Sequence, residues 1–212
     1  MGGQSLLFIG RRFQTYIKQQ NLKHFVTFNF MNNQKVAIFI DGSNLYHGLK
    51  SMGIRKINFE EFAKLIADNR ELQRVFYYTA MMDKDFDAER FAKHQRFLQK
   101  LSSIPKFKIV FCTFKKIIKN SGKIRYEIKG DDVQLANDML VGAYENRYDV
   151  AVLVSGDEDF KPVVRTIRRL GKRVENVFFR GGSSSRLRKT CNSSKNIRFI
   201  FEELKRRPGI TK

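Results

Sequence analysis

The chain has 212 residues, of which 42% are hydrophobic, and these proportions fit one α/β domain with an extension and exclude a chain too polar to fold. Its formal net charge of +20 indicates a polyanionic partner, nucleic acid before an anionic membrane surface. Cys112 and Cys191 are far apart in the sequence, so they indicate neither a zinc site nor a disulfide framework. No apolar run reaches the roughly 18 residues of a membrane span. We therefore expect a cytoplasmic protein with no membrane partner.

The first 34 residues are predicted to be a basic, poorly packed extension. Residues 1–30 contain four basic residues and no acidic residue, and they lack the long apolar stretch of a signal peptide. We expect residues 35–205 to form a single domain and residues 206–212 to form a basic tail.

Strand and helix patterns alternate along the rest of the chain. Short apolar runs predict strands at 35–40, 72–79, 107–113, 150–155 and 173–179, with a last edge strand at 197–200. Periodic patterns predict helices at 45–52, 59–69, 85–102, 132–145 and 160–170, and a short basic helix after 181–185. Residues 114–128 read as a hairpin that turns at 120–122. This alternation predicts an α/β fold with a mostly parallel central sheet covered by helices on both faces.

Two of the predicted strands stop at an aspartate in a glycine turn. Asp41 follows the strand at 35–40, and Asp157 and Asp159 follow the strand at 150–155. Asp132 opens the helix that precedes the second of these strands. The carboxyl ends of parallel strands meet at one edge of a sheet, so we expect the four carboxylates to lie together. Because like charges raise one another's pKa, such a cluster favours a bound Mg²⁺ or Mn²⁺, which prefers carboxylate oxygens.

Each of these aspartates taken alone also fits a helix cap or a turn, which is a competing interpretation. Around them, Asp131, Asp138 and Ser155 are candidates for support of the site, although the two aspartates also fit a solvent-exposed position. Asn44 is assigned to the site, where it orients a metal-bound water or a phosphate, or else it only closes its turn. His47 is interpreted as a helix-face residue, because a metal ion can itself lower the pKa of bound water.

Positive charge gathers in residues 160–200, which contain twelve Lys or Arg residues and one acidic residue, Glu175. The competing interpretation of such a run is a solvated surface, but its one-sided charge favours contact with phosphates. The residues predicted to hold an RNA backbone are Lys129, Arg165, Arg168, Arg169, Lys172, Arg186, Arg188 and Lys189.

Three segments together resemble the NYN domain: VAIFIDGSN at 36–44, KGDDVQLANDM at 129–139 and SGDEDF at 155–160. The LabA-like branch of the PIN-like nuclease superfamily is the most similar. The segment SSRLRKTCNSSKNIRFI at 184–200 is similar to the closing part of that branch, and the resemblance covers about residues 35–204. It implies a PIN-like three-layer α/β/α sandwich that cleaves RNA with Mg²⁺ or Mn²⁺. The ligands carried over are Asp41, Asp132, Asp157 and Asp159, with Asn44 beside them. Asp131 stands where many relatives have an apolar residue.

These observations predict an endoribonuclease-type hydrolase in which metal-activated water cleaves RNA phosphodiester bonds at the aspartate cluster. The alternative is a non-catalytic RNA-binding or regulatory protein that keeps the acidic pocket. A phosphatase of the haloacid dehalogenase type is disfavoured, because Ser43 stands two positions after Asp41, where that chemistry needs a second aspartate. RNA is the expected partner, and a homodimer or a regulatory protein partner stays open.

Overall fold

The computed structural model describes residues 33–80, 88–118 and 124–206, with the backbone alone over 114–118 and 124–129. The chain divides into two units, Met1–Gln34 and Lys35–Lys212, and nearly all described residues belong to the second. The predicted extension lies almost wholly outside the described residues, and so do the tail from residue 207 and the hairpin turn at 120–122. Their interpretation stays a prediction.

The described residues of the second unit form a seven-stranded sheet in the order β4-β3-β2-β1-β5-β6-β7. All neighbouring strands are parallel except β3 and β4, which form an antiparallel hairpin. This confirms the predicted, mostly parallel α/β fold. The strands are β1 Lys35–Asp41, β2 Glu71–Ala80, β3 Phe107–Ile118, β4 Ile124–Lys129, β5 Val150–Val154, β6 Arg173–Phe178 and β7 Ser193–Asn196.

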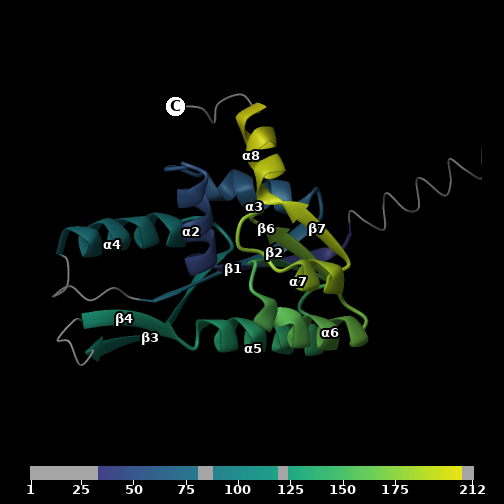
Figure 1. Ribbon diagram of the computed structural model, residues 1–212. Helices are drawn as coiled ribbons and strands as arrows, with labels where there is room; N and C mark the ends of the chain where they lie inside the picture. Colours follow the sequence, from purple (N-terminus) through teal and green to yellow (C-terminus); the bar gives the residue numbers. More distant parts are fainter. Residues whose placement is uncertain (1–32, 81–87, 119–123, 207–212) are drawn as a thin grey trace, which may run out of the picture. The chain divides into compact units, whose positions relative to one another are not determined.

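Helices cover both faces of the sheet, which gives three layers (Figure 1). The helices on one face are α2 Gly42–Ser51, α3 Phe59–Ala67, α4 Ala88–Ser102 and α8 Ile197–Arg206. Those on the other are α5 Asp131–Tyr144, α6 Lys161–Arg169 and α7 Ser185–Thr190. A short 3₁₀ turn, η1 Glu158–Phe160, leads into α6. None of the helices within the described ranges has the length and apolar content needed to cross a bilayer.

The central strand β1 divides its side chains between two cores. Val36, Ile38 and Ile40 pack toward α3 and α8, whereas Ala37 and Phe39 pack toward α5 and α6. Because successive side chains of a strand point to opposite faces, a strand between two helical layers has to be apolar at every position. The unbroken apolar run that ends at Asp41 follows from this central position.

The predicted edge strand at 197–200 is wrong, because these residues begin helix α8, and the edge strand is β7. Ile197, Ile200 and Phe201 are buried at helical spacing, and the Phe201 ring stacks on Phe62 of α3 with centroids 6.0 Å apart. A run of four residues is too short to separate helical from strand periodicity. β7 itself consists of polar and mostly exposed residues, so it carries no hydrophobic signal.

Candidate functional site

Asp41, at the end of β1, has its carboxylate held by two hydrogen bonds. Its Oδ1 accepts from the Asn44 N–H at 2.9 Å, which makes Asp41 the N-cap of α2. Its Oδ2 accepts from the Ser155 hydroxyl at 2.9 Å. The side chain is therefore both a helix cap and part of a larger polar site.

The turn after β5 contacts the turn after β1. The Gly156 N–H donates to Asn44 Oδ1 at 3.2 Å, and the Asp157 N–H donates to Ser155 Oγ at 3.2 Å. This contact is possible because β1 and β5 are neighbours, with Ile40 paired with Val154 at their carboxyl ends. The sheet order thus brings together two acidic turns that are more than one hundred residues apart in sequence.

These turns line a pocket of about 330 Å³ at the carboxyl edge of the sheet. α5 contributes to its wall through Asp131 and Asp132 at its first turn. The remaining lining residues come from the turn after β5, from α2 and from the loop after β6, namely Asp157, Ser43, Asn44, His47, Gly48, Ser51, Phe179, Gly181 and Gly182. Acidic side chains from three separate stretches of chain therefore meet in one cavity.

Burial and the neighbouring carboxylates raise the pKa values of two aspartates in the pocket. Burial, followed by the charges of Asp131, Asp41, Asp157 and Asp159, raises the pKa of Asp132 from 3.8 to about 6. Burial is also the main cause that raises the pKa of Asp41, opposed by the hydrogen bonds from Asn44 and Ser155. The pocket thus concentrates negative charge that its own hydrogen bonds do not fully compensate.

The carboxylates of this pocket fit a hard divalent cation, because their oxygens repel one another and are the ligands that such a cation prefers. In the described part of the chain, however, no three His, Cys, Asp or Glu side chains lie close enough together to hold an ion as they stand. The carboxylates line a common cavity but would have to rotate inward to share an ion.

The sequence matches the NYN domain family over residues 35–198. The chain belongs to this family. NYN domains are a nuclease-type family, so a nuclease-like, RNA-related role follows for this chain. A crystal structure of a Vibrio parahaemolyticus RIMD 2210633 protein of unknown function is similar, with 23% identity, a TM-score of 0.57, and coverage of 78% of this chain and 94% of that one. At this identity the likeness supports the fold alone. No curated protein matches the chain.

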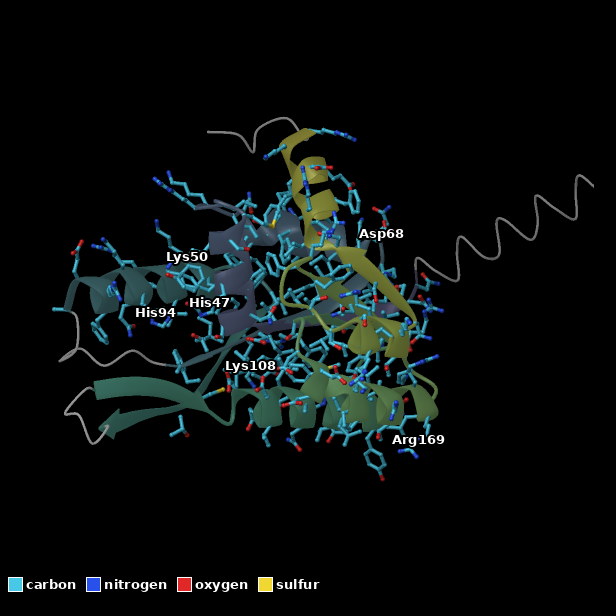
Figure 2. The ribbon with its side chains drawn as sticks, in the orientation of Figure 1. His47, Lys50, Asp68, His94, Lys108 and Arg169 are labelled. Atoms are coloured by element: carbon cyan, nitrogen blue, oxygen red, sulfur yellow. The ribbon has the colours of Figure 1, made fainter. Side chains whose placement is uncertain are left out.

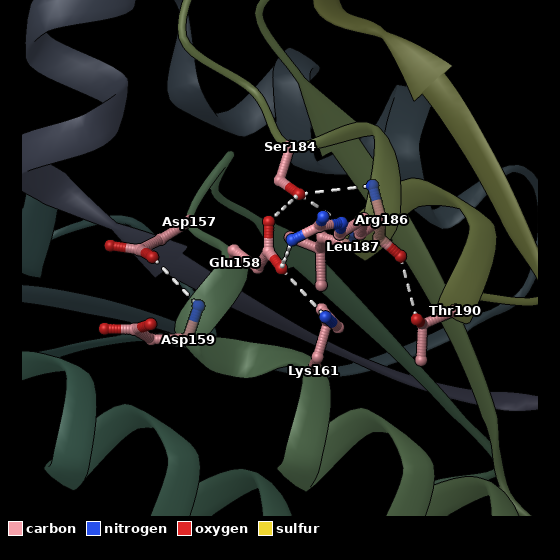
Figure 3. Close-up of polar contacts among 8 residues, drawn as sticks. All are labelled: Asp157, Glu158, Asp159, Lys161, Ser184, Arg186, Leu187 and Thr190. Carbon is pink, nitrogen blue, oxygen red and sulfur yellow. Dashed lines mark hydrogen bonds and ion pairs between the residues drawn. The ribbon is translucent and has the colours of Figure 1, made fainter.

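Two of the predicted acidic residues lie apart from the pocket of this NYN domain. Asp138 accepts hydrogen bonds from the Tyr78 hydroxyl and from Gln134 Nε2, each at 2.9 Å, so it ties α5 to β2. Asp159 is exposed and does not line the cavity, although its N–H donates to Asp157 Oδ1 at 2.9 Å. Figure 3 shows the Asp157 and Asp159 carboxylates pointing in the same direction. Asp159 therefore lies at the rim of the site.

Glu158, the middle acid of the same turn, points away from its two neighbours and forms a separate network (Figure 3). It accepts from Lys161 Nζ at 2.8 Å, from the Ser184 hydroxyl at 2.7 Å and from Arg186 Nη1 at 3.3 Å. These contacts, with Lys161 contributing most, lower the pKa of Glu158 to about 2. Sequence reasoning missed this role, because three adjacent acids in one turn do not reveal which of them faces the pocket.

A close backbone approach completes the link between this turn and the loop before α7. The Ser184 N–H donates to the Gly156 carbonyl at 2.9 Å. A Cβ atom at Gly156 would lie 2.8 Å from the Gly182 carbonyl oxygen, which is too close for any side chain. Glycine at 156 therefore allows the two loops of the NYN domain to meet beside Asp157.

The structure divides the predicted RNA-binding residues into two groups. Arg165, Arg168, Arg169 and Lys172 line a groove along α6, with Arg168 donating to the Thr190 carbonyl at 2.5 Å. On α7, Arg186 contacts Glu158, Arg188 lies over the Phe178 ring at 4.7 Å, and Lys189 is exposed. The Lys129 side chain lies outside the described residues. The expected basic residues thus fall into two groups, one along the α6 groove and one on α7, and Arg168 joins them through its bond to Thr190.

Sequence reasoning also missed one wall of the pocket. His47, Gly48 and Ser51 lie three, four and seven residues after Asn44, a spacing that places them on the same face of α2. That spacing was a usable signal. The loop at 179–182 follows the carboxyl end of β6, and it belongs at the same edge of the sheet for the same reason as Asp157.

Proposed function

We propose that this NYN domain is a metal-dependent ribonuclease of the LabA-like branch that hydrolyses RNA phosphodiester bonds internally. The observation that supports this most is that Asp41, Asp132 and Asp157, from three separate stretches of chain, line one pocket. The proposal includes a domain at residues 35–205, RNA as partner and the cytoplasm as location.

The residues proposed to hold Mg²⁺ or Mn²⁺ are Asp41, Asp132 and Asp157, with Asp159 at the rim. A divalent ion held by these carboxylates would activate water and would offset the charge that builds up on the scissile phosphate and the leaving oxygen. The donor chemistry supports this assignment, since burial and then the neighbouring carboxylates raise the pKa of Asp132, and a cation would offset both effects.

The surrounding residues restrict how the acidic groups can move. The Ser155 hydroxyl and the Asn44 N–H hold the two oxygens of Asp41 in one orientation. Gly156 and Asn44 lock the two acidic turns together, so Asp157 keeps its position relative to Asp41. His47 lines the opening from α2, where its ring can hydrogen-bond to a phosphate oxygen or a ribose hydroxyl. Together these contacts fix Asp41 and the backbone of both turns, while the other carboxylates still have to rotate to share an ion.

The test is cleavage of a labelled single-stranded RNA by purified protein with Mn²⁺ or Mg²⁺ and with EDTA. Asp157→Asn removes one proposed ligand charge with little change in volume, and we expect it to lower cleavage at least about a hundredfold while the protein stays folded. Asp68→Asn is the matched control. Asp68 is exposed at the end of α3, apart from His47 in Figure 2, and asparagine tolerates its left-handed backbone conformation (φ 51°).

Metal-dependent cleavage that is lost in Asp157→Asn and kept in Asp68→Asn is the expected result. Equal cleavage by Asp157→Asn and the wild type would refute the site assignment. Tight RNA binding without cleavage, in the wild type as in the variant, would favour the non-catalytic RNA-binding module instead.

A further inference from the structure

A second cavity, of about 770 Å³, runs along the outer face of α6. It extends from Pro162, at the start of the helix, to Arg173, at the start of β6, and Asn192 borders it on the opposite side. Its basic lining residues are Arg165, Arg168, Arg169, Lys172 and Arg173. The groove therefore begins beside the acidic turn at Asp157–Asp159 and ends at the opposite edge of the sheet.

Helical periodicity explains why the positive charges face one way. Val164 and Ile167 are buried against the sheet, so Arg165 and Arg169 project from the other side of α6. Arg168, four residues after Val164, lies at the flank of the helix and reaches the Thr190 carbonyl of α7. Arg169 lies near the end of the helix, well away from the pocket residue His47 in Figure 2. The sequence thus builds a helix with one apolar face and one guanidinium-rich face.

The groove keeps most of its charge uncompensated. Among its described lining residues none is acidic. The nearby Asp149 carboxylate contacts Lys172, with Nζ and Oδ1 3.4 Å apart, and accepts from the Lys35 N–H at 2.9 Å. Arg168 and Arg169 donate to a backbone carbonyl and to the Thr166 hydroxyl, which are neutral acceptors. Guanidinium groups in this state bind phosphate oxygens well, because their planar array of donors can engage two oxygens at once.

We infer that this groove is a second RNA-binding site, which holds the backbone of a single strand whose scissile phosphate lies in the acidic pocket. This inference rests on the proposed function and adds a path for the substrate along α6. The nine residues of α6 span about 13 Å at 1.5 Å per residue. A groove of this length accommodates more than one backbone phosphate of a single strand. Efficient substrates therefore extend beyond the cleaved bond by at least the length of α6.

The separation of the two sites also has an electrostatic reason. The acidic pocket repels phosphates until a cation is bound, so it cannot by itself hold a long polyanion. A basic groove that begins beside the pocket and runs along α6 supplies affinity without placing positive charge between the aspartates. Binding and cleavage thus depend on different residues of the chain.

The experiment measures binding of a single-stranded RNA of about 20 nucleotides, longer than the groove, by fluorescence anisotropy in EDTA, so that binding is read independently of cleavage. The groove variant is Arg165→Glu/Arg169→Glu. We expect affinity to fall at least about tenfold and the slope of log affinity against log salt to become shallower by about 1.4, since two phosphate contacts are lost. The control variant is Arg55→Glu/Lys56→Glu, which makes the same change in net charge at exposed residues between α2 and α3. Arg165→Gln/Arg169→Gln serves the same test if the charge-reversed protein fails to fold.

Cleavage of two substrates separates the sites further. The groove variant should raise KM for the long RNA with little change in kcat, and it should cleave a trinucleotide as the wild type does. Equal affinities and equal salt slopes for the groove and control variants would overturn the inference, even if the wild type cleaves RNA. Loss of RNA binding in the groove variant, with binding kept in the control variant, would support the groove as an RNA-binding site. That result would stand even if no cleavage is found and the proposed nuclease function fails. Binding of anionic vesicles or polyglutamate as tight as that of RNA, with the same loss in the groove variant, would also overturn the inference.

Discussion

The Ser155 hydroxyl donates to Asp41 Oδ2 at 2.9 Å, and this hydrogen bond joins residues 114 positions apart in sequence. Both side chains are buried, at the carboxyl ends of the adjacent strands β5 and β1. The bond fixes an acidic side chain of the pocket from the neighbouring strand. It therefore couples the stability of the sheet to the geometry of the site.

Replacing Ser155 by alanine should cost both stability and activity. A buried hydrogen bond to a charged group contributes about 2 kcal/mol, so we expect the free energy of unfolding to fall by about that amount. Cleavage should decrease through kcat more than through KM, because Asp41 loses its fixed orientation. Urea denaturation and steady-state kinetics measure the two effects, with the exposed Ser102→Ala as control. A variant that matches the control in both measurements would show that the bond is dispensable.

The stability of the metal-free protein should fall as pH rises through the titration of Asp132. Its carboxyl has an ordinary pKa of 3.8, whereas burial and neighbouring charges raise the pKa to about 6 in the folded protein. Between these values the folded state binds more protons than the unfolded state, so raising the pH favours unfolding. Asp132→Asn should weaken this dependence. Urea denaturation in EDTA from about pH 4 to pH 7 measures it, and the same pH slope in both proteins would contradict the assignment.

Removing the carboxylate of Glu158 should loosen the start of α7. Ser184 caps this helix by accepting from the N–H groups of Arg186 and Leu187, and its hydroxyl in turn donates to Glu158 Oε2. In Glu158→Ala we expect faster amide hydrogen exchange in the peptides that contain Arg186 and Leu187. The exposed Glu60→Ala, which breaks a pair with Lys64 on α3, is the control. Unchanged exchange at α7 would show that the network does not hold this loop.

The hydroxyl of Tyr78 should stabilise the contact between β2 and α5. It donates to Asp138 Oδ2 at 2.9 Å from a buried ring. Tyr78→Phe keeps the ring and removes the donor, so we expect a loss of about 1.5 kcal/mol in the free energy of unfolding. Tyr144→Phe makes the same change in a side chain that is 77% exposed, and it should be neutral. Equal unfolding free energies for the two variants would rule out a contribution from this hydrogen bond.

Much of the fold could be predicted from the sequence, because β1 and β5 are continuous apolar runs that only a strand between two helical layers requires. The meeting of Asp41 and Asp157 at one edge followed from the rule for parallel strands. β7 could not be found, since an exposed edge strand made of Ser193, Ser194, Lys195 and Asn196 has no apolar face.

Side-chain direction within a turn was beyond the reach of sequence reasoning. Residue type does not distinguish the side-chain directions of Asp157, Glu158 and Asp159. In the structure the first lines the pocket, the second contacts Lys161 and Arg186, and the third is exposed. The arrangement of the basic run was hidden for a similar reason. A count of charges along the chain does not show that Arg169 lines the groove along α6, whereas Arg186 contacts Glu158.

The pairing of β1 with β5 also determines when the chain can fold during synthesis. β1 is central, with β2 on one side, but its other neighbour, β5, is made more than one hundred residues later. Until Val150–Val154 has left the ribosome, one edge of β1 has no partner, and apolar side chains such as Val36 and Phe39 lack part of their cover. Such long-range pairing makes folding slow and exposes the nascent chain to aggregation. The same pairing that covers the open edge of β1 brings Ser155 and Asp157 to Asp41, so the aspartates assemble only when the centre of the sheet does.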